Sequence, residues 1–405
     1  MWPVLQQVFT RGSAALKFFV AAYFLGPEQV GLFGIALLLI ALIEGVTDTG
    51  LVQAIIQSKR EPSRHQLGAC WTLQLLRGCF IGGVLCAVAS PISILFNARE
   101  AQPIILLSAL WPVMKGLNNP GVTVTLRHRK FRQVFFGETA ASFIDLAVSL
   151  MLIVALHASA IAMVIGILAA ELVRILISWT LLHSSLLPNF RWRIIGRWRS
   201  YGKWVWASSI IILILNNFDK LVVAKLTTPA EFGIYTVAFR VAQIAIAEPL
   251  VAFGQFLFPT LARLFSAGER MSFEYFCNVL RLVVLAALLL GALVAAVQSV
   301  ATQVLLQSRW AGVGEILKIA VITMCQAGLI STFAAYFRAT GRPQVVTQAV
   351  SIQLLALALS ASVLVPQFGV SGAAAASAVA HGVTLIALSL KFGGIDRRLN
   401  AMAAS

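Results

Sequence analysis

Long apolar stretches dominate this chain, and short polar segments rich in proline and glycine interrupt them. An α-helix needs about 20 predominantly apolar residues to cross the hydrocarbon core of a bilayer. Cutting the sequence at its polar breaks gives twelve such stretches. They cover residues 3–25, 31–57, 67–95, 103–125, 134–156, 159–183, 203–225, 231–260, 274–299, 311–337, 346–365 and 369–391. The pattern therefore predicts an all-α integral membrane protein with about twelve membrane-spanning helices.

Basic residues concentrate in every second break between these stretches. The six basic clusters hold Lys59, Arg60 and Arg64; Arg127, Arg129, Lys130 and Arg132; Arg191, Arg193, Arg197, Arg199 and Lys203; Arg263 and Arg270; Arg338 and Arg342; and Arg397 and Arg398. The intervening breaks carry little charge, with Arg99 and Arg309 among the few examples. Since loops rich in lysine and arginine stay in the cytoplasm, this alternation predicts that both termini are cytoplasmic.

The composition agrees with a membrane protein and excludes several other classes. Of the 405 residues, 59% are hydrophobic and 11% are charged, whereas a soluble domain carries about 25% charged residues. A net charge of +16 would suit nucleic-acid binding in a soluble protein. Here the basic residues lie in short loops, as in membrane proteins, so we expect no nucleic-acid partner. The first apolar stretch shows no signal-peptide cleavage site and is predicted to be the first spanning helix.

Motifs for enzymatic or metal chemistry are missing from the sequence. No GxxxxGK[ST], HExxH or GxSxG pattern occurs, so neither ATP hydrolysis by a P-loop nor zinc or serine hydrolysis is indicated. The five cysteines form no CxxC pair, and the five histidines are scattered. We expect His381 to pack within the last span, with titration there as the alternative. The sequence therefore predicts no cofactor, no metal ion and no enzymatic activity.

The two halves of the chain share a short repeated motif. Residues 27–36 read PEQVGLFGIA and residues 229–238 read PAEFGIYTVA, each in the predicted outer loop that joins the first two spans of its half. The identical pairs are Pro27 and Pro229, Gly31 and Gly233, and Ala36 and Ala238. Because six spans separate the copies, the repeat is parallel, with its pseudo-two-fold axis along the membrane normal. Such repeats are typical of transporters.

This repeat predicts a division of the chain into two six-helix bundles. The N-terminal bundle covers residues 1–183 and the C-terminal bundle covers residues 203–393. Between them, residues 184–202 form a basic and aromatic cytoplasmic linker, which suits either an amphipathic helix on the anionic leaflet or an ordinary connector. Residues 394–405 are predicted to be a short cytoplasmic tail.

Five short segments are distributed along the chain: LGPEQVGLF at 25–33, DTGLVQAIIQ at 48–57, NFDKLVV at 217–223, GIYTVAFR at 233–240 and RATGRP at 338–343. Together they resemble the polysaccharide transporter family, the Wzx-like oligosaccharide flippases of the multidrug/oligosaccharidyl-lipid/polysaccharide superfamily. The resemblance covers most of the chain. The sequence differs from many relatives in two features. The basic residues that precede the first span in those relatives are missing, and twelve spans are predicted where some branches have fourteen.

The resemblance implies two six-helix bundles around a central cavity. It also implies movement of an undecaprenyl-diphosphate-linked oligosaccharide from the cytoplasmic to the periplasmic leaflet of the bacterial inner membrane, for O-antigen, capsule or exopolysaccharide synthesis. The partners it implies are the lipid-linked oligosaccharide, the membrane lipids, and polysaccharide polymerase and export proteins. We expect the protein to function as a monomer.

Ionisable residues inside the predicted spans point to a polar interior. Each costs about 2.5–3.5 kcal/mol at mid-membrane, so the cations are expected to face a cavity where they bind the diphosphate. The predicted cavity cations are Arg11, Lys17, Lys115, Arg174, Lys220, Arg240 and Lys318. Amides available for the sugar, or for hydrogen bonds between helices, are Asn118, Asn119, Asn216, Asn217, Gln326, Gln348 and Gln353.

A second set of intramembrane residues is acidic and predicts ion coupling. Its members are Glu44, Asp48, Asp145, Asp219 and Glu248. Glu44 and Asp48 share one helix face, where two carboxylates form a proton or cation site unless each pairs with a cation on a neighbouring helix. Glu171 and Arg174, three residues apart, are expected to pair with each other.

Three other functions compete with the flippase hypothesis. A cation-coupled multidrug exporter of the same superfamily is disfavoured by the many intramembrane arginines and lysines. A membrane glycosyltransferase or polymerase would need a large extramembrane loop with catalytic residues, and the predicted outer loops are short. The hypothesis of a non-transporting scaffold in a polysaccharide-synthesis complex is not excluded by the sequence, although it does not explain why so many charges lie within the spans.

Overall fold

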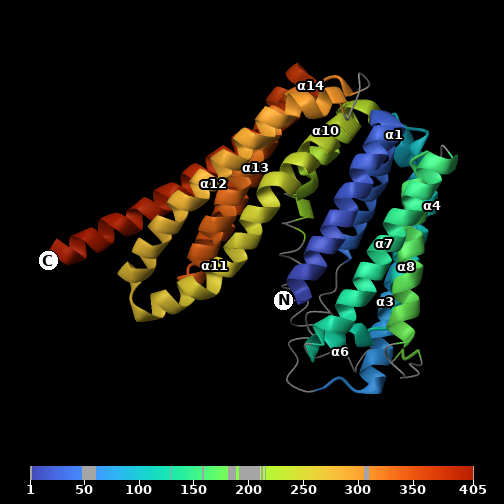
Figure 1. Cartoon of the computed structure of the whole chain (residues 1–405), viewed down its shortest axis with the longest axis horizontal. Helices are drawn as coiled ribbons and strands as arrows, with labels where there is room; N and C mark the ends of the chain where they lie inside the picture. Colours follow the sequence, from blue (N-terminus) through green and yellow to red (C-terminus); the bar gives the residue numbers. More distant parts are fainter. Residues whose placement is uncertain are drawn as a thin grey trace. The chain divides into compact units, whose positions relative to one another are not determined.

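The computed structural model describes residues 2–47, 61–128, 130–156, 159–180, 188–190, 210, 213–214, 216–304 and 310–404, and every regular element in these ranges is a helix (Figure 1). By its internal contacts the chain divides into two compact units. Unit 1 comprises Met1–Asn217 and Thr228–Gly233, and unit 2 comprises Phe218–Thr227 and Ile234–Ser405. Most of the predicted linker 184–202 lies outside the described residues, so the predicted domain boundaries stay predictions.

Unit 1 consists of helices that run side by side. They are α1 (Trp2–Val46), α3 (Arg64–Leu95), α4 (Ala101–Ser108), α5 (Leu110–Gly116), α6 (Gly121–Arg127), α7 (Phe131–Leu156) and α8 (Ile161–Thr180). Helix α7 packs on both α1 and α8, and α3 packs on α4 and α5. Close packing depends on small residues, as at Gly78, where an added Cβ would lie 2.3 Å from the Pro112 carbonyl oxygen.

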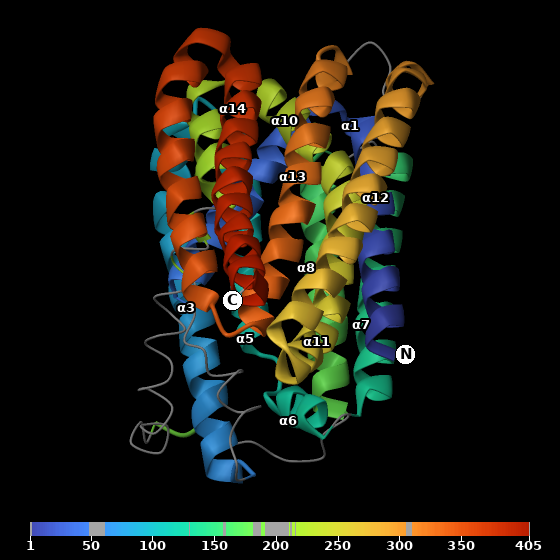
Figure 2. The same cartoon turned by 90° about the vertical axis from the view of Figure 1, so that its left-hand side faces the viewer.

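Unit 2 is a second helical bundle. Residues 218–226 are helical, followed by α10 (Pro229–Ala242), the π-helix η2 (Gln243–Ala247), α11 (Glu248–Ala267), α12 (Glu269–Val304), α13 (Val313–Ala339) and α14 (Pro343–Ala404). Helix α13 contacts α11, α12 and α14 (Figure 2). One end of the core is aromatic, with the Phe276 ring 4.5 Å from Tyr336 and 5.1 Å from Phe392 between centroids.

Large apolar side chains also cover the outer faces of the helices. Leu288, Leu355 and Leu390 are 64%, 65% and 71% exposed in the isolated chain. Eight helices of the described ranges are long and apolar enough to cross a membrane. Burying such faces in water-free surroundings is favourable, so these leucines are suited to contact lipid.

Two of the eight long helices each combine two predicted spans. Leu5–Val46 and Pro343–Ile395 measure 42 and 53 residues, well beyond the roughly 20 that one crossing requires. Each is interrupted by a glycine with positive φ, namely Gly26 at 79° and Gly369 at 56°, a conformation that glycine adopts most readily. Every one of the twelve predicted spans overlaps a helix of the structure, and the all-α membrane fold is confirmed.

The predicted span 103–125 is wrong in one respect, because it is three short helices rather than one. Ala109 separates α4 from α5, and residues 117–120 separate α5 from α6. Pro112 follows the first break and Pro120 ends the second, and proline lacks the N–H that a continuous helix needs. The second break places Asn118 and Asn119 in a short non-helical segment, which leaves backbone and amide groups outside a helix.

The two copies of the repeated motif contact each other through equivalent residues within unit 1. A Cβ added to Gly31 would lie 1.8 Å from the carbonyl oxygen of Pro229, and a Cβ added to Gly233 would lie 1.9 Å from that of Pro27. Both obstacles are backbone atoms, so side-chain rotation cannot remove them. The helix that contains the first motif and the start of α10 can approach this closely only because both positions are glycine.

We expect Gly31→Ala and Gly233→Ala each to destabilise the protein by about 1–3 kcal/mol, the range for overpacking a well-packed interface. Thermal unfolding of the purified protein measures this. Gly83→Ala is the matched control, because an added Cβ there meets nothing within 4 Å and alanine is the better helix former by about 1 kcal/mol. Unfolding temperatures of the two variants at or above that of the control would contradict the close backbone contact.

Candidate binding cavity

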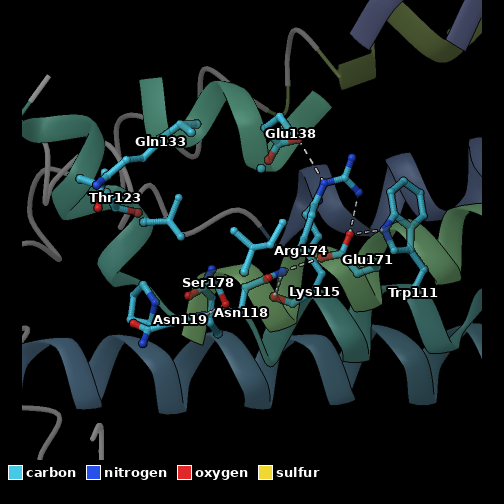
Figure 3. A pocket seen from close by; sticks show the side chains of 17 residues that line it. Trp111, Lys115, Asn118, Asn119, Thr123, Gln133, Glu138, Glu171, Arg174 and Ser178 are labelled. Carbon is cyan, nitrogen blue, oxygen red and sulfur yellow. Dashed lines mark hydrogen bonds and ion pairs between the residues drawn. The ribbon is translucent and has the colours of Figure 1, made fainter. Parts of the chain in front are cut away.

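A cavity of about 530 Å³, lined by both polar and apolar residues, lies within unit 1, between α3, α5, α6, α7 and α8 (Figure 3). Its polar lining comprises Gln74, Trp111, Lys115, Asn118, Asn119, Thr123, Thr125, Gln133, Glu138, Glu171, Arg174 and Ser178. This volume is in the range of small-molecule binding sites. Of the seven predicted cavity cations, Lys115 and Arg174 line it.

Arg174 is held between two carboxylates from different helices. Its Nε donates to Glu138 Oε2 of α7 at 3.1 Å, and its Nη1 donates to Glu171 Oε2, one turn earlier on α8, at 3.2 Å. The Glu171–Arg174 pairing expected from the sequence is therefore present, and Arg174 forms a second ion pair with Glu138. The side chains of Arg174 and Glu138 are 29% and 33% exposed, whereas that of Glu171 is 4% exposed.

Glu171 is fixed by two further donors. The indole Nε1 of Trp111 donates to Glu171 Oε2 at 3.2 Å, and Asn118 Nδ2 donates to Glu171 Oε1. Figure 3 shows these three side chains converging on Glu171 from α5, α8 and the break after α5. A buried carboxylate requires such compensation, because burying a charge is costly unless it is paired and hydrogen-bonded.

Lys115 forms a second ion pair at the edge of the cavity. Its Nζ lies 3.0 Å from Glu44 Oε1 and 3.1 Å from Oε2, and its side chain is 49% exposed. The ammonium also lies 5.6 Å from the centre of the Trp111 ring, within the range of a cation–π contact. Of the two interpretations of Glu44, pairing with a cation on another helix is the one that the geometry shows.

The opposite end of the cavity is built from amide and hydroxyl groups. The Asn119 backbone N–H donates to Ser178 Oγ at 3.0 Å, and Asn119 Oδ1 accepts the Gly121 N–H at 2.9 Å. The Asn119 side-chain nitrogen is buried and has no hydrogen-bond partner among the described residues. Because an unsatisfied buried donor is unfavourable by about 1–3 kcal/mol, this wall is suited to an oxygen acceptor.

The other predicted residues lie away from this cavity. The buried Lys17 pairs with the half-buried Asp145, with Lys17 Nζ 2.5 Å from Asp145 Oδ1 and 3.0 Å from the Met163 carbonyl oxygen. Arg11 and Lys318 are exposed, and Lys220 is half-buried. Asp48 lies outside the described residues. The assignment of these residues to substrate binding or ion coupling stays a prediction.

In unit 2, two predicted acids have identified partners. Asp219 accepts a hydrogen bond from the buried Tyr235 hydroxyl at 2.5 Å. Glu248 pairs with Arg240 at 3.6 Å, although eight residues separate them, because the intervening π-helix Gln243–Ala247 shifts the helix register. Single-turn π-helices occur frequently at functional sites. Within the described ranges, no group of three or more His, Cys, Asp or Glu residues is arranged to hold a metal ion.

Sequence reasoning missed Glu138, Trp111 and Gln133 as lining residues. Glu138 lies inside the predicted span 134–156, so its intramembrane charge was a usable signal. Trp111 and Gln133 carry no such signal, since tryptophan and glutamine are common at membrane interfaces and between helices.

Comparison with known proteins identifies sequence relatives. The family model described as "Polysaccharide biosynthesis protein" matches residues 20–315. The lipopolysaccharide biosynthesis protein WzxC of Escherichia coli is 24% identical over 288 residues, which is 68% of this chain. The succinoglycan biosynthesis transport protein ExoT of Rhizobium meliloti is 23% identical over 84% of this chain and 68% of its own length. The match with WzxC spans a little over half, 56%, of that relative.

Solved structures share the fold at low sequence identity. The lipid II flippase MurJ in an inward closed conformation has a TM-score of 0.75 at 14% identity, over 96% of this chain and 86% of MurJ. An inward-facing multidrug resistance MATE family transporter of the MOP superfamily has a TM-score of 0.74 at 14% identity, over 99% of both chains. These structures share the fold, and the family model confirms the predicted resemblance to polysaccharide biosynthesis transporters.

Proposed function

The chain belongs to the polysaccharide biosynthesis protein family, and from this membership we propose that it is a flippase for lipid-linked saccharides. Its long apolar helices and its relatives make it a multi-pass bacterial membrane protein. The proposed reaction moves an undecaprenyl-diphosphate-linked oligosaccharide from the cytoplasmic to the periplasmic leaflet, with no covalent chemistry. The saccharide would then enter O-antigen, capsule or exopolysaccharide synthesis.

The observation that carries the proposal is the chemistry of the unit 1 cavity. Arg174 offers a planar fork of donors suited to phosphate oxygens, and Lys115 offers a mobile point charge. Asn118, Asn119 and the Trp111 ring provide the hydrogen bonds and the flat apolar face that a sugar requires. A diphosphate cannot cross hydrocarbon unaccompanied, and here cations and sugar-binding groups line the same 530 Å³ space.

We propose that transport occurs by alternating access, which the fold shared with these transporters supports. In our proposal the headgroup enters the cavity while the lipid tail stays in the bilayer. Several contacts of moderate strength bind the headgroup, and they bind it with different affinity in the inward-open and outward-open states. We further propose that both termini are cytoplasmic, that the protein works as a monomer in the inner membrane, and that polysaccharide polymerase and export proteins receive its product.

Reconstitution tests this function directly. The purified chain is placed in liposomes with a fluorescent undecaprenyl-diphosphate oligosaccharide, and reduction by membrane-impermeant dithionite reports the fraction in each leaflet. We expect the protein to equilibrate the lipid between leaflets, and a proton gradient to change the rate. Leaflet distributions that match protein-free liposomes would contradict the proposal.

A cation-coupled multidrug exporter is the second candidate, because the fold is shared with a MATE transporter and three carboxylates lie in or beside the cavity. In the structure each of the three, Glu44, Glu138 and Glu171, is already paired with a lysine or arginine. Gradient-driven extrusion of a cationic dye without movement of the lipid-linked oligosaccharide would favour this candidate.

A further inference from the structure

We propose that Glu138 is an exchangeable counter-anion, which holds Arg174 in the empty cavity and is replaced there by a phosphate group of the substrate. The inference rests on the proposed function, because it concerns how the diphosphate gains access to Arg174. It predicts that the carboxylate of Glu138 competes with the substrate rather than binding it.

The two carboxylates that hold Arg174 differ in how firmly they are fixed. Glu171 is 4% exposed and receives hydrogen bonds from Trp111, Asn118 and Arg174. Glu138 is 33% exposed, and Arg174 is its described partner. Displacing Glu171 would leave a buried carboxylate and two unpaired donors, which is strongly unfavourable. Displacing Glu138 breaks one bond and returns a part-exposed carboxylate to water.

The geometry of the guanidinium makes this exchange chemically simple. Arg174 uses Nη1 for Glu171 and Nε for Glu138, with its 29% exposure directed to the cavity that both residues line. A phosphate oxygen can accept the Nε–H in place of the Glu138 oxygen, because both are anionic acceptors of the same hydrogen bond. Glu171 meanwhile keeps the fork oriented, which makes it a positioning residue.

The charge balance of the cavity explains why an exchange is needed. The charged side chains that line it are Lys115 from α5, Glu138 from α7, and Glu171 and Arg174 from α8. Glu44 of α1 pairs with Lys115 at the cavity edge, and the lining residues from α3 and α6, such as Gln74 and Thr123, carry no charge. Two cations therefore face three carboxylates, so an entering diphosphate gains a cationic partner only where a carboxylate leaves its place beside that cation.

Removing the carboxylate tests the exchange. A Glu138→Gln variant has no anion to displace from Arg174, so it should bind an anionic substrate more tightly than the unsubstituted protein.

Farnesyl diphosphate binding to the purified full chain in detergent tests the proposal, with farnesol as the uncharged control. Tryptophan fluorescence reports binding at pH 8. We expect Glu138→Gln to bind about 10- to 150-fold more tightly than the unsubstituted protein, the range expected when one charge-assisted hydrogen bond need not be broken. We also expect weaker binding by Glu171→Gln.

The matched control is Glu274→Gln, which removes the carboxylate partner of Arg270 on the exposed face of α12 and should leave binding unchanged. Equal or weaker binding by Glu138→Gln would overturn the proposal, as would binding of farnesyl diphosphate by neither protein. The liposome assay reports the proposed function separately. Flipping by the unsubstituted protein together with weaker binding by Glu138→Gln would refute the exchange and leave the flippase intact.

Discussion

Replacing Lys17 with methionine is expected to destabilise the protein by about 3–5 kcal/mol, the range for removing one partner of a buried ion pair. Lys17 on α1 is 5% exposed and bonds to both Asp145 on α7 and the Met163 carbonyl on α8. Methionine fills a similar volume, so the loss comes mainly from the carboxylate that is left without its cation. The unfolding temperature of the detergent-solubilised protein should fall by on the order of 10 °C.

The double variant Lys17→Met/Asp145→Asn distinguishes charge from packing. It removes both charges, and replacing a buried pair by neutral groups of similar volume is often nearly neutral. We expect it to recover most of the lost stability. A single Lys17→Met variant that is as stable as the unsubstituted protein would show that this lysine is not needed to join α1, α7 and α8, and would restore it as a candidate for the diphosphate.

Lys17 also shows what the sequence can and cannot predict. Its position in an apolar stretch predicted a polar surrounding, because a lone charge in hydrocarbon is too unfavourable. The sequence does not tell whether Lys17 faces a substrate cavity or a single carboxylate, because its partner Asp145 lies 128 positions away in the chain. The same limit applies to Arg174, whose partner on its own helix was predictable from the three-residue spacing, while Glu138 on α7 was not.

The helices themselves were predictable because their pattern is local. Apolar stretches of about 20 residues separated by charged breaks specify spans whatever packs beside them. The prediction failed at residues 103–125, where the apolar pattern continues but Pro112 and Pro120 accompany two breaks. Those breaks place Lys115, Asn118 and Asn119 on the cavity wall, so the backbone irregularity and the candidate site have one origin.

Arg174→Lys is expected to lower transport of the lipid-linked oligosaccharide by at least about tenfold while the protein still folds. Lysine keeps the positive charge but lacks the planar fork, so it cannot hold Glu171 and present a second, oriented donor to the cavity at the same time. A loss of one charge-assisted hydrogen bond corresponds to about 1.5–3 kcal/mol, which is about 10- to 150-fold in binding. The liposome assay measures the rate, and the unfolding temperature reports folding.

Arg174→Ala provides the contrast that assigns the loss to geometry. It leaves Glu138 and the 4%-exposed Glu171 without their cation, so it should lower stability as well as transport. Arg270→Lys on the exposed face of α12, also paired to a glutamate one turn away, is the control and should change neither. If Arg174→Lys transported at the full rate, charge alone would suffice, and the forked contact to phosphate, with the Glu138 exchange that depends on it, would have to be abandoned.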